Sequence, residues 1–288
     1  MKNILIIPNT QKDRDFSVSS KVASVLKSYG ISVFVEERYN TDLGGIAKAI
    51  ASIDDRIELI IVIGGDGSVI DASVPAVSHG IPVLGVNLGH LGYLAEVELS
   101  NLGALEKLTR GEYVIEEKML LSVTATDDGE LIQSARFAVN DVIISHESYV
   151  GLAELKMRVN DGESVKYRAD GLILSTPVGS TAYSLSAGGP IIAHDIDSIA
   201  ATPICPHSLY SRAVILPQEA KMSVKIGKPQ PQYGKKPDVE AYLTVDGGEA
   251  ISVANGETIV ISRSELCARF ISFDKDGFYD RLKNKFME

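Results

Sequence analysis

The chain has 288 residues and a formal net charge of −10, from 28 Lys and Arg against 38 Asp and Glu. Its composition, 45% hydrophobic and 23% charged, excludes wholesale disorder, and its length indicates one large domain or two ordinary ones. The acidic balance argues against a protein that binds duplex nucleic acid, because that class neutralises phosphates with Lys and Arg.

The first hundred residues alternate between two hydrophobic periods. Short apolar runs predict strands at residues 3–7, 31–35, 58–63 and 82–86. Helical spacing predicts helices at residues 17–29, 42–53 and 69–78, with Ser17 as the first N-cap and Gly30 ending that helix. Strands that alternate with helices predict a parallel, doubly wound sheet.

After about residue 110 the pattern changes to long strands and tight turns. Strands are expected at residues 114–125, 131–145, 155–159, 164–168, 242–245 and 250–253. The turns between them are rich in Asp-Gly or Asn, which is typical of antiparallel hairpins. We therefore predict an α/β domain over residues 1–100 and a β-rich domain over residues 101–267, with a terminal helix in residues 268–288 that packs back on the first domain.

The sequence shows neither a disulfide scaffold nor a membrane anchor. Cys205 and Cys267 are too few and too far apart for a scaffold, and we interpret both as free thiols of the core. No apolar run approaches the ~18 residues needed to span a bilayer. The expected location is the cytoplasm, with no membrane partner.

A glycine-rich segment, Gly64-Gly65-Asp66-Gly67-Ser68, follows the most apolar strand and precedes a helix. Open α/β sheets bind ligands at this end of their strands, where glycines and a helix N-terminus admit phosphates. The segment is neither a Walker A loop nor a G-x-G-x-x-G fingerprint. The Asp66 carboxylate would repel a polyphosphate unless a metal lies between them or the carboxylate acts on a hydroxyl. The alternative is a tight turn without a ligand.

Two further segments combine polar groups with apolar strands. Residues 175–190 are rich in Ser, Thr, Ala and Gly, which suits either a polar ligand or a close-packed loop. The pair Asn140-Asp141 interrupts an apolar strand, and either a ligand or a β-bulge would account for it. The five histidines show no metal-ligand spacing.

Together these segments resemble the NAD kinase family. The stretches that carry the resemblance are residues 64–68, 85–94, 140–141, 170–190, 205–209 and 245–248. Gly-Gly-Asp-Gly alone also occurs in lipid kinases and phosphofructokinases, whereas the run Ser-Thr-Pro-x-Gly-Ser-Thr-Ala-Tyr is specific. The resemblance implies an α/β N-terminal domain, an all-β, sandwich-like C-terminal domain and an active site in the cleft between them.

The resemblance also implies an activity and its residues. The γ-phosphoryl group of ATP would pass to the 2′-hydroxyl of the adenosine ribose of NAD, giving NADP, with Asp66 as general base. The phosphate loop would comprise Gly64, Gly65, Gly67 and Ser68. The residues expected to contact NAD are Gly67, Tyr93, Asn140, Asp141, Arg168, Asp170, Thr181, Ala182, Tyr183, Ser186 and Gly248. Mg²⁺ or another divalent metal would be held mainly by the ATP phosphates, and a homodimer or homotetramer is expected.

Three residues depart from the family pattern: Asp141 replaces a usual Glu, Val178 a usual Thr or Ser, and Gly248 a common Gln. Each shortens or removes one polar side chain near the expected NAD contacts. Two alternatives to a dinucleotide kinase remain: a lipid or sugar kinase that shares the Gly-Gly-Asp-Gly loop, and a non-catalytic dinucleotide sensor.

Overall fold

The computed structural model describes residues 1–89, 92–127, 130–146, 153–208, 211–226, 241–254, 256–273 and 277–287. The chain divides into two compact units, unit 1 with Met1–Lys118 and Cys267–Glu288, and unit 2 with Met119–Leu266. The expected boundary lay earlier, at residues 100 and 101. The stretch that follows it, η2 (Leu99–Glu106) and α3 (Lys107–Arg110), belongs to unit 1 because its leucines lie in that unit's core.

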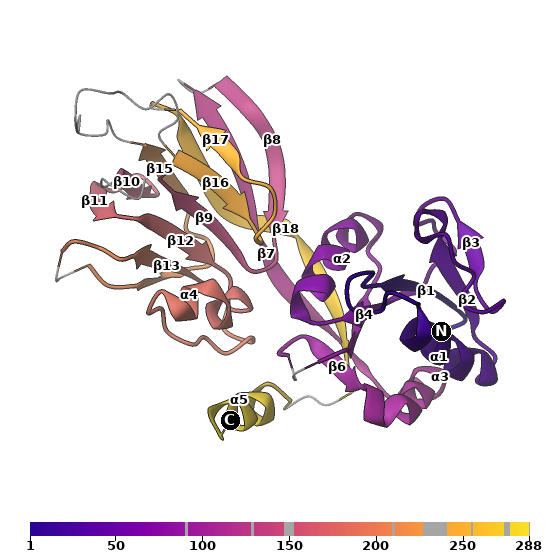
Figure 1. Cartoon of the computed structure of the whole chain (residues 1–288). Coiled ribbons are helices and arrows are strands. Elements are labelled where there is room, and N and C mark those ends of the chain that lie inside the picture. The colour runs from indigo at the N-terminus through magenta and orange to yellow at the C-terminus, as the bar shows by residue number, and fades with distance from the viewer. Residues whose placement is uncertain are drawn as a thin grey trace. The chain divides into compact units, whose positions relative to one another are not determined.

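Unit 1 is built on a parallel sheet in the order β5-β4-β1-β2-β3, of which Figure 1 labels β1, β2, β3 and β4. Its strands are β1 (Asn3–Pro8), β2 (Ser32–Glu36), β3 (Lys48–Ile50), β4 (Leu59–Gly64) and β5 (Val83–Asn87). β6 (Ala95–Glu98) and the end of β18 (Thr258–Ser272) also pair with β5 in the parallel sense. The predicted strands at residues 3–7, 31–35, 58–63 and 82–86 are confirmed.

Helices cover both faces of this sheet. Helix α1 (Ser17–Ser28) packs into one apolar cluster with Ile4 and Ile6 of β1. Helix α2 (Asp66–His79) lies on the other face, where its Val69 side chain is close to Gly85. Since successive residues of a strand point to opposite faces, the arrangement confirms the doubly wound α/β prediction.

The ends of α1 differ in part from the prediction. Its N-cap is Phe16, not Ser17, and the capping group comes from further back in the chain. The Asp13 carboxylate accepts the N–H groups of Val18 at 3.1 Å and Ser19 at 2.9 Å. At the other end Gly30 has a φ of 77°, so the predicted termination is confirmed.

Residues 42–53 do not form the expected helix. Gly44 and Gly45 have φ angles of 75° and 77°, a left-handed backbone that an α-helix cannot contain. Residues 48–50 instead form β3, which pairs in parallel with β2. Pairing with the sheet edge therefore overrides the local apolar spacing.

Unit 2 consists of two antiparallel sheets. One has the order β14-β13-β12-β9-β16-β17 and contains β9 (Asp141–Ser145), β12 (Gly171–Ser175), β13 (Ser198–Ile204), β14 (Val214–Pro217), β16 (Ala241–Val245) and β17 (Ile251–Val253). The other is the antiparallel part of a 12-stranded sheet that continues through β18 into the parallel strands of unit 1. It contains β7 (Val114–Asp127), β8 (Glu130–Ala138), β10 (Ala153–Val159), β11 (Ser164–Ala169), β15 (Met222–Ile226) and the first part of β18. One apolar core includes residues of both sheets, which confirms the sandwich-like prediction.

Two of the predicted hairpins, β10–β11 and β16–β17, are confirmed. In the second, Asp246 and Gly247 have φ angles of 49° and 70° and are the central residues of a tight turn that the Gly248 N–H closes on the Val245 carbonyl. β7 and β8 pair as predicted, although residues 128 and 129 of their turn lie outside the described residues. The return strand expected over residues 131–145 is wrong, because the chain leaves β8 at Ala138 and starts β9 in the other sheet.

The remaining elements are short or terminal: η1 (Glu37–Tyr39), η3 (Gly179–Thr181), α4 (Tyr183–Ser186) and α5 (Gly277–Met287). Both cysteines are free, as predicted, but Cys205 is exposed and Cys267 is half-buried. The prediction that both cysteines lie in the core is therefore wrong. No helix in the described parts of the chain has the length and apolar character needed to span a membrane.

Candidate active site

The glycine-rich segment joins a buried strand directly to a helix. β4 ends at Gly64 and α2 begins at Asp66, three residues earlier than its apolar spacing predicted. The Asp66 carboxylate accepts three backbone N–H groups, those of Tyr93 on Oδ2 at 2.7 Å and of Leu94 and Ala95 on Oδ1 at 3.0 and 3.3 Å. The carboxylate is therefore oriented by a loop that follows the neighbouring strand, β5.

Close approach of the two loops depends on missing side chains. A methyl group on Gly92 would overlap the Asp66 carboxylate, and one on Gly64 would overlap the Ser68 side chain. Glycine at these two positions lets the helix N-terminus, the strand end and the 92–95 loop meet.

The loop after β1 also reaches the glycine-rich segment, which sequence reasoning missed. Asn9 donates from its side-chain amide to Ser68 Oγ at 2.7 Å, and its Oδ1 accepts the N–H of Lys12 at 3.0 Å. The Lys12 ammonium lies 3.8 Å from the position that a Cβ on Gly65 would occupy. The signal available in the sequence was that Asn9 and Lys12 follow the end of a strand adjacent to β4.

Tyr93 lies next to Asp66 but points into unit 1. Its side chain is only 8% exposed, and its ring contacts Phe278 of α5 with a centroid distance of 6.0 Å. Burial, with a smaller contribution from the Asp66 charge, raises the pKa of Tyr93. The contact between Tyr93 and adenine stays a prediction.

In unit 2, Asp246 explains why the chain breaks at Asn140-Asp141. The Asp246 carboxylate accepts the N–H groups of Val139 at 2.7 Å, Asn140 at 2.8 Å and Asp141 at 2.9 Å. These bonds hold the backbone between the end of β8 at Ala138 and the start of β9 at Asp141, where the chain passes from one sheet to the other over residues 139 and 140. The turn of the β16–β17 hairpin thereby fixes the polar pair that we singled out.

Asp141 is buried and faces a second acid. Burial, and then the negative charge of Asp246, raise the pKa of Asp141 to about 7. Its side chain belongs to a residue only 4% exposed. The Asp141 side chain, one methylene shorter than the Glu expected from the resemblance, is thus buried.

Residues 175–190 begin as a close-packed loop, one of the two alternatives for this segment. Ser175, Thr176, Ser180 and Ser184 are buried. Thr176 binds the turn twice, through its N–H to the Asn140 carbonyl at 2.8 Å and through Oγ1 to the Val139 carbonyl at 2.6 Å. A methyl group on Gly179 would overlap the Asn140 carbonyl, so this loop lies directly on the Asn140-Asp141 turn.

The more accessible residues of this segment follow the buried ones. Thr181 and Ala182 are half-buried, whereas Tyr183 and Ser186 of α4 are exposed. The Tyr183 ring, 45% exposed, is available to an aromatic or apolar ligand surface. These four are predicted NAD contacts, and the structure places them within one short stretch of unit 2.

The other predicted contacts of unit 2 lie at strand ends. Asp170 joins β11 to β12, and its carboxylate is 3.8 Å from His146 Nε2. The exposed Arg168 lies opposite Glu154 in the ladder between β10 and β11. Its backbone carbonyl accepts the His207 N–H at 2.9 Å. Gly248 closes the β16–β17 turn by donating its N–H to the Val245 carbonyl at 2.9 Å.

Comparisons with known proteins cover both units. The families described as "ATP-NAD kinase N-terminal domain" and "ATP-NAD kinase C-terminal domain" match residues 4–113 and 139–273. The NAD kinase of Caldanaerobacter subterraneus subsp. tengcongensis is 34% identical over 291 aligned positions, which cover 100% of both chains. That of Natranaerobius thermophilus is 35% identical over 289 positions, 99% of this chain and 98% of its own. The chain belongs to the NAD kinase family.

Solved structures of NAD(H) kinases share the fold. Yeast NADH kinase complexed with NADH has a TM-score of 0.83 at 23% identity, covering 99% of this chain and 87% of its own. An NAD kinase from Archaeoglobus fulgidus in complex with ATP has a TM-score of 0.70 at 22% identity, covering 99% and 97%. At such identities the likeness confirms the fold of a NAD kinase.

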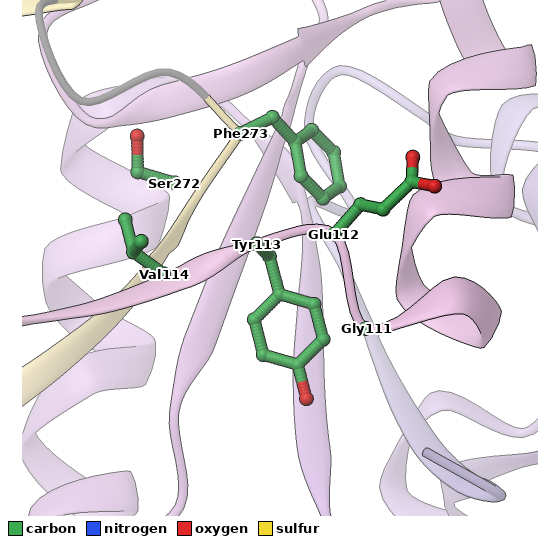
Figure 2. A pocket seen from close by; sticks show the side chains of 6 residues that line it. All are labelled: Gly111, Glu112, Tyr113, Val114, Ser272 and Phe273. Atoms are coloured by element: carbon green, nitrogen blue, oxygen red, sulfur yellow. The ribbon is translucent and has the colours of Figure 1, made fainter.

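Two further features of this NAD kinase family member are its potential metal ligands and a pocket in unit 1. Within the described residues, no three His, Cys, Asp or Glu side chains are grouped to hold a metal ion. A pocket of about 310 Å³ in unit 1 is lined by Gly111, Glu112, Tyr113, Val114, Ser272 and Phe273, as Figure 2 shows. None of these is a predicted site residue, so the pocket is separate from the residues that carry the family resemblance.

Proposed function

We propose that the protein is an ATP-dependent NAD kinase that phosphorylates the 2′-hydroxyl of the adenosine ribose of NAD. The observation that carries the proposal is the Asp66 carboxylate, held by three N–H groups at the start of α2 in a chain of this family. A carboxylate has about four lone-pair positions. Oδ1 accepts two of these bonds and Oδ2 one, which leaves Oδ2 able to accept a substrate proton.

In the proposed reaction, the ribose 2′-oxygen attacks the γ-phosphorus of ATP. The new bond joins that oxygen to the γ-phosphorus, the bond from the γ-phosphorus to the β–γ bridging oxygen breaks, and ADP leaves. The hydroxyl proton passes to Asp66 Oδ2, which requires a distance of about 2.6–3.2 Å in the bound complex. The chain contributes mainly alignment and electrostatics, as is general for phosphoryl transfer.

The phosphates of ATP would lie against Gly64, Gly65, Gly67 and Ser68. The N-terminus of α2 presents free N–H groups and a positive dipole end there. Lys12, beside Gly65, supplies the positive charge that the loop itself lacks. This combination accounts for phosphate binding by a chain whose net charge is −10.

The dinucleotide would contact the residues that unit 2 gathers around Asn140. Asn140 and Asp141 are fixed by Asp246 and by the 175–190 loop, and Thr181, Ala182, Tyr183 and Ser186 lie further along the same loop. We propose Arg168, Asp170 and Gly248 as further contacts, because each lies at a strand end of this unit.

Mg²⁺ enters the proposal only as a companion of ATP. Protein sites usually hold it through one or two carboxylates together with substrate phosphates. We expect the ATP phosphates to hold the metal, and no step above depends on it. The homo-oligomer, the cytoplasmic location and a site between the two domains stay predictions.

Incubation of the purified protein with ATP, Mg²⁺ and NAD tests the proposed activity. We expect NADP, detected by a dehydrogenase specific for NADP. Tight NAD binding without NADP would instead support the dinucleotide sensor. Phosphorylation of a lipid or a sugar in place of NAD would support the other kinases with this loop.

The variant Asp66→Asn tests the role of the carboxylate. We expect unchanged NAD affinity and a kcat lower by ~10²-fold or more, the range for loss of a positioned base. Asn can still accept N–H bonds through its one carbonyl oxygen, which makes it the mildest replacement. Near-normal turnover would remove Asp66 from the proposed role.

A further inference from the structure

The segment that orients Asp66 is itself held by contacts with residues near the C-terminus. Its donors are the N–H groups of residues 93–95, and Glu96 is the next residue along β6. Any movement of residues 93–96 therefore moves the carboxylate. Both ends of this short segment contact the C-terminal part of the chain.

Glu96 holds one end through both carboxylate oxygens. Oε2 accepts Arg281 Nη1 of α5 at 3.1 Å, and Oε1 accepts the Phe273 N–H at 2.6 Å. The side chains of Glu96 and Arg281 are only 8% and 16% exposed. By contrast, Glu117 and Arg269 form a pair with exposures of 57% and 42%. Water and salt screen the Glu96–Arg281 pair less than a surface pair, so its two charges attract each other more strongly than those of the exposed pair.

Tyr93 holds the other end through its ring contact with Phe278. Phe278 and Arg281 are three residues apart on α5, and residues with this spacing lie on the same face of a helix. One face of α5 thus contacts residues 93 and 96, on either side of the N–H donors of Leu94 and Ala95.

We propose that α5 is a positioning element for Asp66. Arg281 and Phe278 hold residues 93–96 in the place from which three N–H groups orient the carboxylate. The inference rests on the proposed function, in which Asp66 is the catalytic residue. Arg281 and Phe278 are positioning residues, since they act through the segment and touch neither substrate nor reacting atoms.

Kinetics of Arg281→Ala in the full chain test the proposal. We expect kcat to fall by ~10-fold or more, because a misplacement of about 1 Å at a reacting group can cost ~10²-fold. The KM values for NAD and ATP should change by about twofold or less, as expected when only the transition state is affected. Arg281→Lys should restore part of kcat. Lys283→Ala, which alters an exposed lysine on the same helix, should leave kcat unchanged.

A double-mutant cycle separates positioning from a general loss of structure. If Arg281 acts through Asp66, adding Arg281→Ala to Asp66→Asn should lower kcat by less than about twofold, because the carboxylate it positions is already gone. Multiplication of the two losses would overturn the proposal. A lower thermal midpoint for Arg281→Ala with a normal kcat for the folded protein would overturn it as well.

Phe278→Leu provides a second variant in case Arg281→Ala does not fold. It keeps an apolar side chain of similar size but removes the ring that contacts Tyr93, and the same fall in kcat and the same cycle with Asp66→Asn are expected. The two proposals can fail separately. A wild-type chain that makes no NADP contradicts the proposed function, whereas an active wild type with multiplicative losses contradicts only the role of α5.

Discussion

At the scale of residues, the phosphate loop depends on side chains that lie outside it. The Asn9 side chain donates to Ser68 Oγ and accepts the backbone N–H of Lys12. The Lys12 ammonium lies beside Gly65. The sequence pointed to Asp66 and its glycines because a carboxylate in a phosphate loop is unusual. It did not point to Asn9 or Lys12, since only the pairing of β1 with β4 brings their loop next to this one.

Lys12→Ala should weaken the binding of ATP and leave the binding of NAD unchanged. A hydrogen bond or ion pair to a charged group contributes about 1.5–3 kcal/mol, so we expect the KM for ATP to rise by roughly tenfold or more. The KM for NAD should stay within about twofold. Steady-state kinetics with each substrate varied in turn measure both. Lys27→Ala is the matched control, because Lys27 is an exposed lysine at the far end of α1. An unchanged KM for ATP would contradict the role given to Lys12.

At the scale of elements, the break between β8 and β9 shows how one side chain redirects the chain. The apolar pattern on both sides of Asn140-Asp141 predicted a continuous strand, because the pattern reports burial and not which sheet buries the residues. Three N–H groups that bind Asp246 end the first strand. Asp246 is about a hundred residues away in sequence, so no local signal could show the break.

The buried acid at the start of β9 should make stability depend on pH. The pKa of Asp141 is raised from 3.8 to about 7 in the folded chain, so between these values the folded state holds a proton that the unfolded state has released. The resulting stabilisation is complete below about pH 4 and is lost as the pH rises to about 7. The side chain introduced by Asp141→Asn cannot ionise. When the pH rises from 5 to 8, the free energy of unfolding of the wild type should therefore fall relative to that of the variant.

Urea unfolding of both proteins at the two pH values measures this difference. Titration of the remaining acids is common to both chains and cancels in the comparison. Asp161→Asn, at an exposed turn between β10 and β11, should show no such gain. Equal pH dependence of wild type and Asp141→Asn would contradict the raised pKa.

At the scale of the whole molecule, two strands are shared between the units. β18 pairs with β15 in unit 2 through residues 258–261 and with β5 in unit 1 through Phe270. β7 likewise begins in unit 1 and continues in unit 2. Unit 1 is also discontinuous, since it takes Cys267–Glu288 from the end of the chain. The two units are therefore connected through the continuous backbone of β7 and β18, so unfolding of one unit frees one end of each shared strand.

We accordingly expect one cooperative thermal transition that NAD shifts as a whole. A ligand at 100 times its Kd stabilises the folded state by about 2.7 kcal/mol, which corresponds to roughly 5 °C for a chain of this size. Scanning calorimetry with and without NAD measures it, with sodium phosphate at the same concentration as control. Two transitions, of which NAD moves one, would show that the units melt independently.

The sequence by itself determined the alternation of strands and helices, the change to hairpins, the Gly-Gly-Asp-Gly segment and the family. These features are periodic or local, and they report burial and turn geometry directly. Only the tertiary structure decided the edge strand β3 in place of a helix, the anchoring of Asn140-Asp141 by Asp246, and the contacts of Asp66 with residues 93–95 and of these with α5. The first two and the contacts of Asp66 are made through backbone N–H groups, which every residue but proline carries and which therefore leave no mark on the order of side chains. The contacts with α5 are made by side chains whose partners depend on how the chain folds back, which no local pattern specifies.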